Sequence, residues 1–160
     1  MVWLILPAII LVLVIAVTRK RLRDQKPAGK RIVVDGSNVM FWGGDPSEKV
    51  LAAVLRDLVA KGLRPQVIFD ANVGYKLRGH FMDASAMARI CKVPARQIEV
   101  VDKGVSADEV ILSYAKRHGL RVVSNDRYRD WTVRFPLVKQ KGRMLRGTWK
   151  GGTVKWGSKR

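Results

Sequence analysis

Short runs of β-branched and other apolar residues alternate with longer amphipathic stretches along residues 31–138. The short runs predict strands at 31–34, 65–69, 97–101 and 120–124. The amphipathic stretches predict helices over 82–91 and 106–118, and one that starts in Asp45-Pro46-Ser47-Glu48 and ends at Gly62. Because these helices lie between strands, we expect an α/β fold: an open parallel sheet with helices on both faces.

The pattern changes on either side of this domain. Only a short helix is expected after Asp126. Residues 144–149 and 153–156 flank Gly151-Gly152 and predict a β-hairpin or an added edge strand. We therefore divide the chain into an apolar segment (1–18), a basic linker (19–30), the α/β domain (31–138) and a basic C-terminal hairpin or tail (139–160).

The first eighteen residues contain no charged side chain, and Arg19-Lys20-Arg21-Leu22-Arg23 follows directly. As a helix they would span roughly 27 Å, enough to cross the hydrocarbon core of a bilayer. We expect a single transmembrane anchor rather than a signal peptide or a buried helix. The basic run after it predicts an outside N-terminus and a cytoplasmic domain, at the inner membrane if the source is bacterial. We expect Arg19–Arg23 to contact anionic lipid.

The chain carries a large positive net charge, which points to negatively charged partners. Against 31 Lys and Arg there are 13 Asp and Glu, a formal net charge of +18. The cations concentrate in the linker and in the tail, which favours a polyanion as partner: nucleic acid or an anionic membrane surface. The single cysteine excludes an intramolecular disulfide and a cysteine-based zinc site.

Carboxylates follow the predicted strands. Asp35 and Asp70 end the first and second strands, and Asp126 comes just after the fourth. Asp108 lies in the first turn of the helix after the third strand. Because the carboxyl ends of parallel strands share one edge of the sheet, we expect these four side chains to converge. Clustered carboxylates need a cation, and Mg²⁺ or Mn²⁺ prefers oxygen ligands. Such a centre can hydrolyse a phosphodiester.

Each acid also has a purely structural interpretation. Asp35 could form a turn, and Asp70 could end a strand. Asp108 lies where a helix dipole favours an anion, and Glu109 completes a capping box with Ser106. Asp126 and Asp130 could form ion pairs with neighbouring arginines.

Three motifs resemble the NYN domain of PIN-like ribonucleases, in the regnase-type branch: VVDGSNV at 33–39, SADE at 106–109 and VSNDRYRD at 123–130. The resemblance implies a PIN-like sheet and a Mg²⁺-dependent centre that cleaves RNA. It assigns the metal to Asp35, Asp108, Asp126 and Asp130, with Asn38 as a further catalytic residue. Asp70 and Glu109 are possible neighbours of the site. The chain departs from the pattern at Glu109, and one cysteine cannot form the zinc finger of the animal proteins.

Further residues are expected to contact RNA. In the tail, basic residues alternate with tryptophans, a composition typical of sequence-tolerant single-strand binding. The tail could instead contact anionic lipid, or its tryptophans could pack on the sheet. The candidates for contact with single-stranded RNA are Arg127, Arg129, Lys150, Lys155 and Trp156.

The sequence thus predicts a membrane-anchored, metal-dependent endoribonuclease. Two other functions stay open: a non-catalytic module that tethers RNA at the membrane, and a metal-dependent phosphatase acting on nucleotides.

Overall fold

The computed structural model describes residues 30–157. The predicted transmembrane anchor and the basic run at 19–23 lie outside these residues. Within the described part, none of the helices is both long enough and apolar enough to cross a bilayer.

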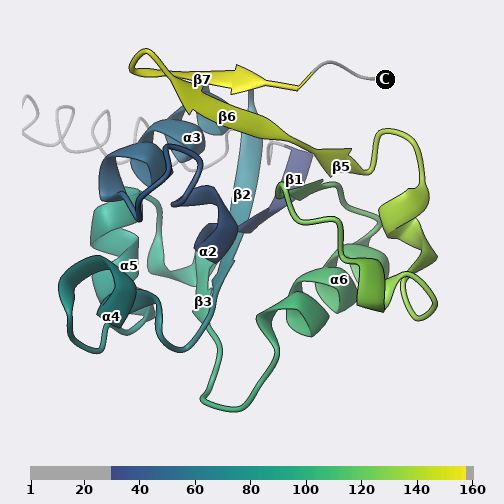
Figure 1. Cartoon of the computed structure of the whole chain (residues 1–160), viewed down its shortest axis with the longest axis horizontal. Coiled ribbons are helices and arrows are strands. Elements are labelled where there is room, and N and C mark those ends of the chain that lie inside the picture. The colour runs from purple at the N-terminus through teal and green to yellow at the C-terminus, as the bar shows by residue number, and fades with distance from the viewer. Residues whose placement is uncertain (1–29, 158–160) are drawn as a thin grey trace, which may run out of the picture.

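A five-stranded parallel sheet forms the centre of the domain (Figure 1). Its strands, in spatial order, are β3 (Ile98–Val100), β2 (Leu63–Phe69), β1 (Lys30–Asp35), β4 (Val122–Val123) and β5 (Met144–Leu145). All four neighbouring pairs are parallel. The expected open parallel sheet is therefore confirmed, with β5 as the added edge strand.

Helices cover both faces of the sheet, as predicted. Helices α3 (Glu48–Ala60), α4 (Val73–Arg78) and α5 (Ala84–Cys91) lie on one side, and α6 (Ala107–His118) lies on the other (Figure 1). Side chains of β1 alternate between the two layers: Ile32 and Val34 join the core with α3 and α5, and Val33 joins the core with α6. This alternation follows from the period of two in a strand.

Local structure differs from the sequence expectations at three places. The turn expected after β1 is one turn of helix, α2 (Gly36–Val39), where a Cβ on Gly36 would lie 2.1 Å from the Phe69 ring. Helix α3, which was expected to start within Asp45–Glu48 with Asp45 as its cap, is instead capped by Ser47, whose hydroxyl accepts from the Val50 N–H at 3.3 Å. Helix α4 was not predicted, because six residues are too few to show an amphipathic period.

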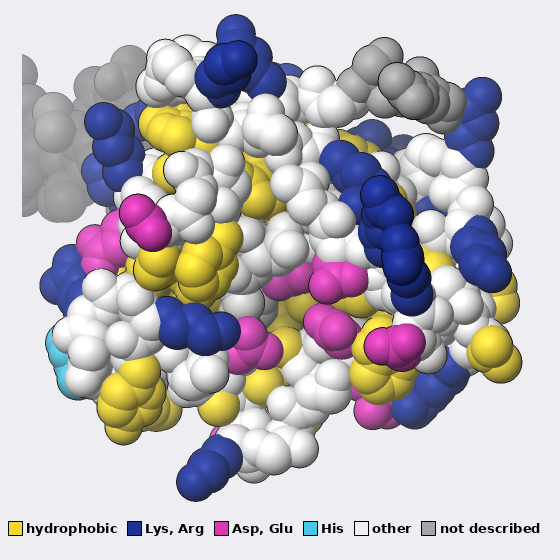
Figure 2. Space-filling view, viewed as in Figure 1, with side chains coloured by type: hydrophobic (Ala, Val, Ile, Leu, Met, Phe, Trp, Pro, Cys, Tyr) yellow, Lys and Arg dark blue, Asp and Glu magenta, His cyan; other side chains and the backbone are white. Residues whose placement is uncertain are grey.

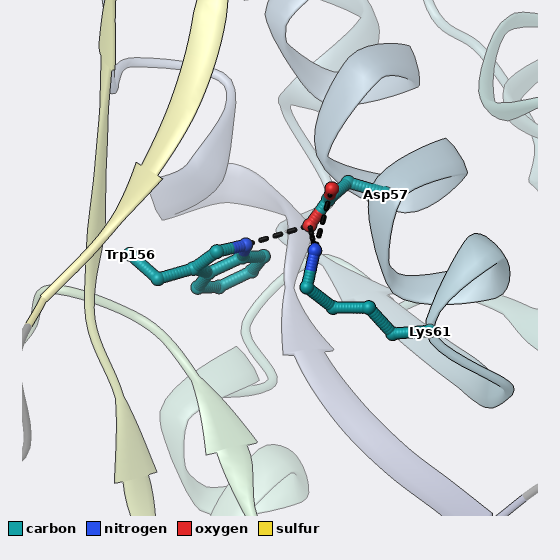
Figure 3. Close-up of polar contacts among 3 residues, drawn as sticks. All are labelled: Asp57, Lys61 and Trp156. Atoms are coloured by element: carbon teal, nitrogen blue, oxygen red, sulfur yellow. Dashed lines mark hydrogen bonds and ion pairs between the residues drawn. The ribbon is translucent and has the colours of Figure 1, made fainter.

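The C-terminal segment divides between two sheets. Residues 144–149 were expected to form one strand, but only β5 joins the parallel sheet. Strands β6 (Gly147–Lys150) and β7 (Thr153–Trp156) then form a separate antiparallel hairpin. The hairpin packs on α3, where Trp156 Nε1 donates to Asp57 Oδ2 at 2.6 Å and Lys61 binds the same carboxylate (Figure 3).

Candidate functional site

Acidic side chains gather around a hollow where the strands of the parallel sheet end (Figure 2). Asp35 ends β1, Asp70 follows β2, Asp108 lies in the first turn of α6, and Asp126 follows β4. Asp108 interacts electrostatically with each of the other three. Lys and Arg side chains flank the hollow on both sides (Figure 2). The parallel topology thus places these four carboxylates at one edge of the sheet, the edge that the sequence analysis predicted.

Asp35 is the most enclosed of these acids, with 5% of its surface exposed. Its Oδ1 accepts from the backbone N–H of Asn38 at 3.0 Å. Its Oδ2 accepts from the Tyr128 hydroxyl at 2.8 Å and from the Ser124 hydroxyl at 2.9 Å. Three donors therefore fix the orientation of this carboxylate before any ligand binds.

Burial raises the pKa values of two acids in the site, Asp35 and Asp108. Loss of hydration raises the pKa of Asp35 from 3.8 to about 6, although the hydrogen bonds from Tyr128, Asn38 and Ser124 act in the opposite direction. The pKa of Asp108 is also raised, first by burial and then by the charge of Asp126, with partial compensation from Trp131. Holding these groups ionised near neutral pH costs free energy that a bound cation would recover.

The loop after β4 is built around the buried carboxylate of Asp35. Ser124 Oγ accepts from the Asp126 N–H at 3.0 Å, and Asp126 Oδ1 accepts from the Tyr128 N–H at 2.6 Å. Tyr128 has φ 48°, ψ 43°, a left-handed conformation that is uncommon for a bulky residue. This conformation accompanies a tyrosine that is 2% exposed and bonded to Asp35.

Ser124 and Tyr128 are functional neighbours that the sequence analysis missed. Both lie within the VSNDRYRD motif, in which the predicted site residues are the acids and the arginines. The available signal was chemical: a tyrosine in a buried position needs a partner for its hydroxyl, and a carboxylate is a strong acceptor.

Asn38, the further catalytic residue implied by the resemblance, has its side-chain oxygen bonded within the protein. Its Oδ1 accepts from Trp42 Nε1 at 3.0 Å and from the Asn125 N–H at 2.9 Å. The Asn125 side chain in turn bonds both backbone groups of Gly147. Asn38 therefore ties α2 to the loop after β4 and, through Asn125, to the start of the hairpin.

The remaining predicted acids lie at the margin. Asp70 pairs with Lys76 at 3.6 Å, and its backbone N–H donates to the Ser37 hydroxyl. Glu109 pairs with Arg134, while its N–H is capped by Ser106. Asp130 is exposed on the 3-10 turn η3 (Arg129–Trp131), where the short helix after Asp126 was expected. Its carboxylate bonds no other residue in 30–157.

A divalent ion bound at this edge would need ligands from the acids and from water. Among residues 30–157, no three Asp, Glu, His or Cys side chains converge closely enough to hold an ion by themselves. Mg²⁺ does not need three, because it commonly binds one or two carboxylates and keeps waters at its other positions. Asp35 and Asp108 are desolvated carboxylates that form no ion pair within the described residues. This donor set fits a partly hydrated Mg²⁺ or Mn²⁺.

The candidates for RNA contact occupy two places. Arg127 and Arg129 are exposed in and after the loop that contains Asp126. Lys150 and Lys155 are exposed on the hairpin, whereas Trp156 is half-buried. The Trp156 ring meets Trp42 edge-on, with 5.7 Å between centroids, in addition to its bond to Asp57. Trp156 therefore packs within the domain, against Trp42 and the Asp57 side chain of α3.

Comparisons with known proteins point to one family and one fold. The family model for the Zc3h12a-like ribonuclease NYN domain matches residues 28–158, which includes β6 and β7. No curated protein matches the sequence. A solved structure of nuclear protein-only RNase P 2 from Arabidopsis thaliana is 17% identical to this chain, with a TM-score of 0.61. The match covers 96% of this chain and 35% of the Arabidopsis chain. A second structure of the same Arabidopsis protein gives 15% identity and a TM-score of 0.62 over 88% of this chain. This chain thus spans about a third of the length of those proteins (35% and 32%), and the likeness concerns the fold.

Proposed function

We propose that this chain, which belongs to the Zc3h12a-like ribonuclease NYN domain family, is a metal-dependent endoribonuclease anchored in a membrane with its catalytic domain in the cytoplasm. The single observation behind this proposal is the desolvated Asp35 carboxylate, held by three donors beside Asp108 and Asp126. A buried acid of this kind is destabilising by itself, which favours a site that evolved for a cation.

Asp35, Asp108 and Asp126 would hold Mg²⁺ or Mn²⁺, directly or through bound water, with Asp130 completing the site from η3. When bound, the ion supplies a water of lowered pKa and neutralises charge that develops on the phosphate. The protein presents Asp35 in one orientation, because Tyr128 and Ser124 occupy its Oδ2 and leave Oδ1 with one donor, the Asn38 N–H. Asn38 keeps the loop containing Asp126 against α2.

Single-stranded RNA is the substrate class that the surface favours. Arg127 and Arg129 lie beside the acids in sequence, and Lys150 and Lys155 extend the positive charge onto the hairpin. Such cations offset the repulsion between the acidic hollow and the phosphate backbone. In this proposal residues 1–18 form the anchor, and Arg19–Arg23 contact anionic lipid at the cytoplasmic face.

The test is cleavage by the full-length chain in detergent or vesicles. Single-stranded RNA, single-stranded DNA and a mononucleotide are incubated with Mg²⁺ or Mn²⁺, and again with EDTA. We expect internal cleavage of RNA that EDTA abolishes and that Asp126→Asn removes. Asp102→Asn is the matched control, because Asp102 is an exposed acid that follows β3 at the same edge of the sheet and is not among the acids that act on Asp35 or Asp108.

Each other result contradicts the proposal in a definite way. RNA binding with no cleavage under any metal would leave a tethering module. Release of phosphate from the mononucleotide, with RNA left intact, would indicate a phosphatase. Full activity of Asp126→Asn would remove this residue from the site.

A further inference from the structure

The edge of the sheet opposite the acids has an arginine at every strand. The residues are Arg31 in β1, Arg64 in β2, Arg96 just before β3, Arg121 just before β4 and Arg143 just before β5. Arg31 and Arg64 are direct neighbours in the register. Because all five strands are parallel, these arginines mark one continuous edge.

Further cations meet this edge from the helices and loops. Helices in such a fold run opposite to the strands, so their C-terminal ends lie at the amino ends of the strands. We call the whole set the amino edge; besides the five arginines it contains Lys30, Lys61, Lys116, Arg117, Lys139 and Lys141. Cations in the last turn of a helix are expected to offset the helix dipole. That explanation does not extend to the arginines of the strands.

Acids are almost absent from this edge within residues 30–157. Asp57 lies there, and it is already bonded to Lys61 and Trp156 (Figure 3). Each of the other acids except Glu99 either follows a strand or lies in or before the first turn of a helix or a 3-10 turn. Glu99 lies in β3, level with Asp35 across the sheet. Apart from Lys61, the cations of the amino edge form no ion pair in the described part of the chain. The domain is therefore electrostatically polarised from one edge of the sheet to the other.

We propose that the amino edge is a docking face for an anionic lipid surface. The chain enters the domain at this edge, since β1 begins at Lys30. Residues 1–18 contain no charged side chain, and the twelve residues from 19 to 30 reach at most about 40 Å when fully extended. A bilayer that holds the apolar segment therefore lies within reach of the amino edge, and the signs of charge are complementary.

RNA is the other polyanion that could bind these cations. The geometry favours lipid, because a scissile phosphate has to reach Asp35, at the far end of a six-residue strand about 20 Å long. Docking through the amino edge turns the acidic hollow away from the bilayer and toward soluble RNA. This inference rests on the membrane anchor of the proposed function but not on the ribonuclease activity, because neither its residues nor its test involve the acids.

The expected strength follows from the number of cations that approach the surface. Each Lys or Arg near an anionic leaflet increases binding roughly fivefold. Removal of two arginines should therefore weaken docking by about 25-fold, and salt should weaken it further because the attraction extends only about one Debye length.

The experiment measures which edge faces the lipid in the full-length chain. A fluorescent donor is attached to Ala95→Cys, at the amino edge, or to Val105→Cys, between β3 and α6 at the opposite edge; both positions are exposed. Cys91 stays unlabelled because it is buried and its thiol pKa is raised to about 12. The chain is reconstituted into phosphatidylcholine vesicles with headgroup acceptors, with or without phosphatidylserine.

With phosphatidylserine, energy transfer from Ala95→Cys should exceed transfer from Val105→Cys, and high salt should remove the difference. Arg64→Gln combined with Arg96→Gln should also remove it. Arg127→Gln combined with Arg129→Gln deletes the same charge from the opposite edge and should leave the difference in energy transfer unchanged. Equal transfer from both labels in phosphatidylserine vesicles would overturn the proposal. If Arg64→Gln with Arg96→Gln weakens binding of single-stranded RNA in detergent by a similar factor, the edge binds RNA and the proposal is likewise overturned.

Discussion

Replacing Asp35 by asparagine should stabilise the domain at neutral pH when no metal is bound. Asparagine has nearly the shape of the protonated acid, and its amide can bond the hydroxyls of Ser124 and Tyr128, which accept as well as donate. The pKa of Asp35 is raised from 3.8 to about 6, a value that already includes its hydrogen bonds. A shift of about two units corresponds to about 3 kcal/mol of penalty on the ionised form. The variant escapes this penalty.

The sign of the pH dependence follows from linkage. The folded protein binds the Asp35 proton more tightly than the unfolded chain, so this stabilising contribution is complete below pH 3.8. It is lost as the pH rises through about 6. The parent and Asp35→Asn should therefore be about equally stable near pH 4, and the variant should be more stable by as much as about 3 kcal/mol at pH 7.5.

The assay is urea unfolding of residues 24–160 in EDTA at a series of pH values, followed by tryptophan fluorescence. The quantity compared is the difference in free energy of unfolding between variant and parent, which cancels the other titrating groups. Asp102→Asn is the control, because it removes one acid from an exposed position. Adding Mg²⁺ or Mn²⁺ should stabilise the parent by about 2.7 kcal/mol at a hundredfold excess over the dissociation constant, and the variant by less. A variant that is less stable than the parent at pH 7.5 without metal would refute this reasoning.

Three further outcomes are expected. Trp156→Ala should lower the free energy of unfolding by about 2 kcal/mol, because the ring packs on Trp42 and bonds Asp57. This is roughly half the cost of deleting a fully buried tryptophan. A change in RNA affinity without a loss of stability would contradict this expectation. Replacing Lys150 and Lys155 with glutamine should leave the melting temperature unchanged and flatten the log–log salt dependence of RNA binding by about 1.4, as two lost phosphate contacts require. Residues 1–18 should keep the chain in the membrane fraction through high-salt and alkaline washes, and release by salt alone would exclude a spanning segment.

Most of the secondary structure, and the edge at which the acids lie, could be predicted from the sequence. Helices α3 and α6 and the strands of the parallel sheet have local signatures: apolar periods, caps and terminating glycines. Once the strands are known to be parallel, a residue at a strand end is placed without further information. Asp35, Asp70, Asp108 and Asp126 needed nothing more than this rule to be assigned to one edge.

The way in which those acids are held depends on contacts between distant parts of the chain. Asp35 meets the hydroxyls of Ser124 and Tyr128 from 89 and 93 residues away, and Asp57 meets Trp156 across 99 residues. No local period encodes such pairs, because they arise when separate elements pack and exclude water from the groups between them. The raised pKa of Asp35 has the same origin: it depends on burial, which is a property of the assembled core and not of the residues adjacent in the chain.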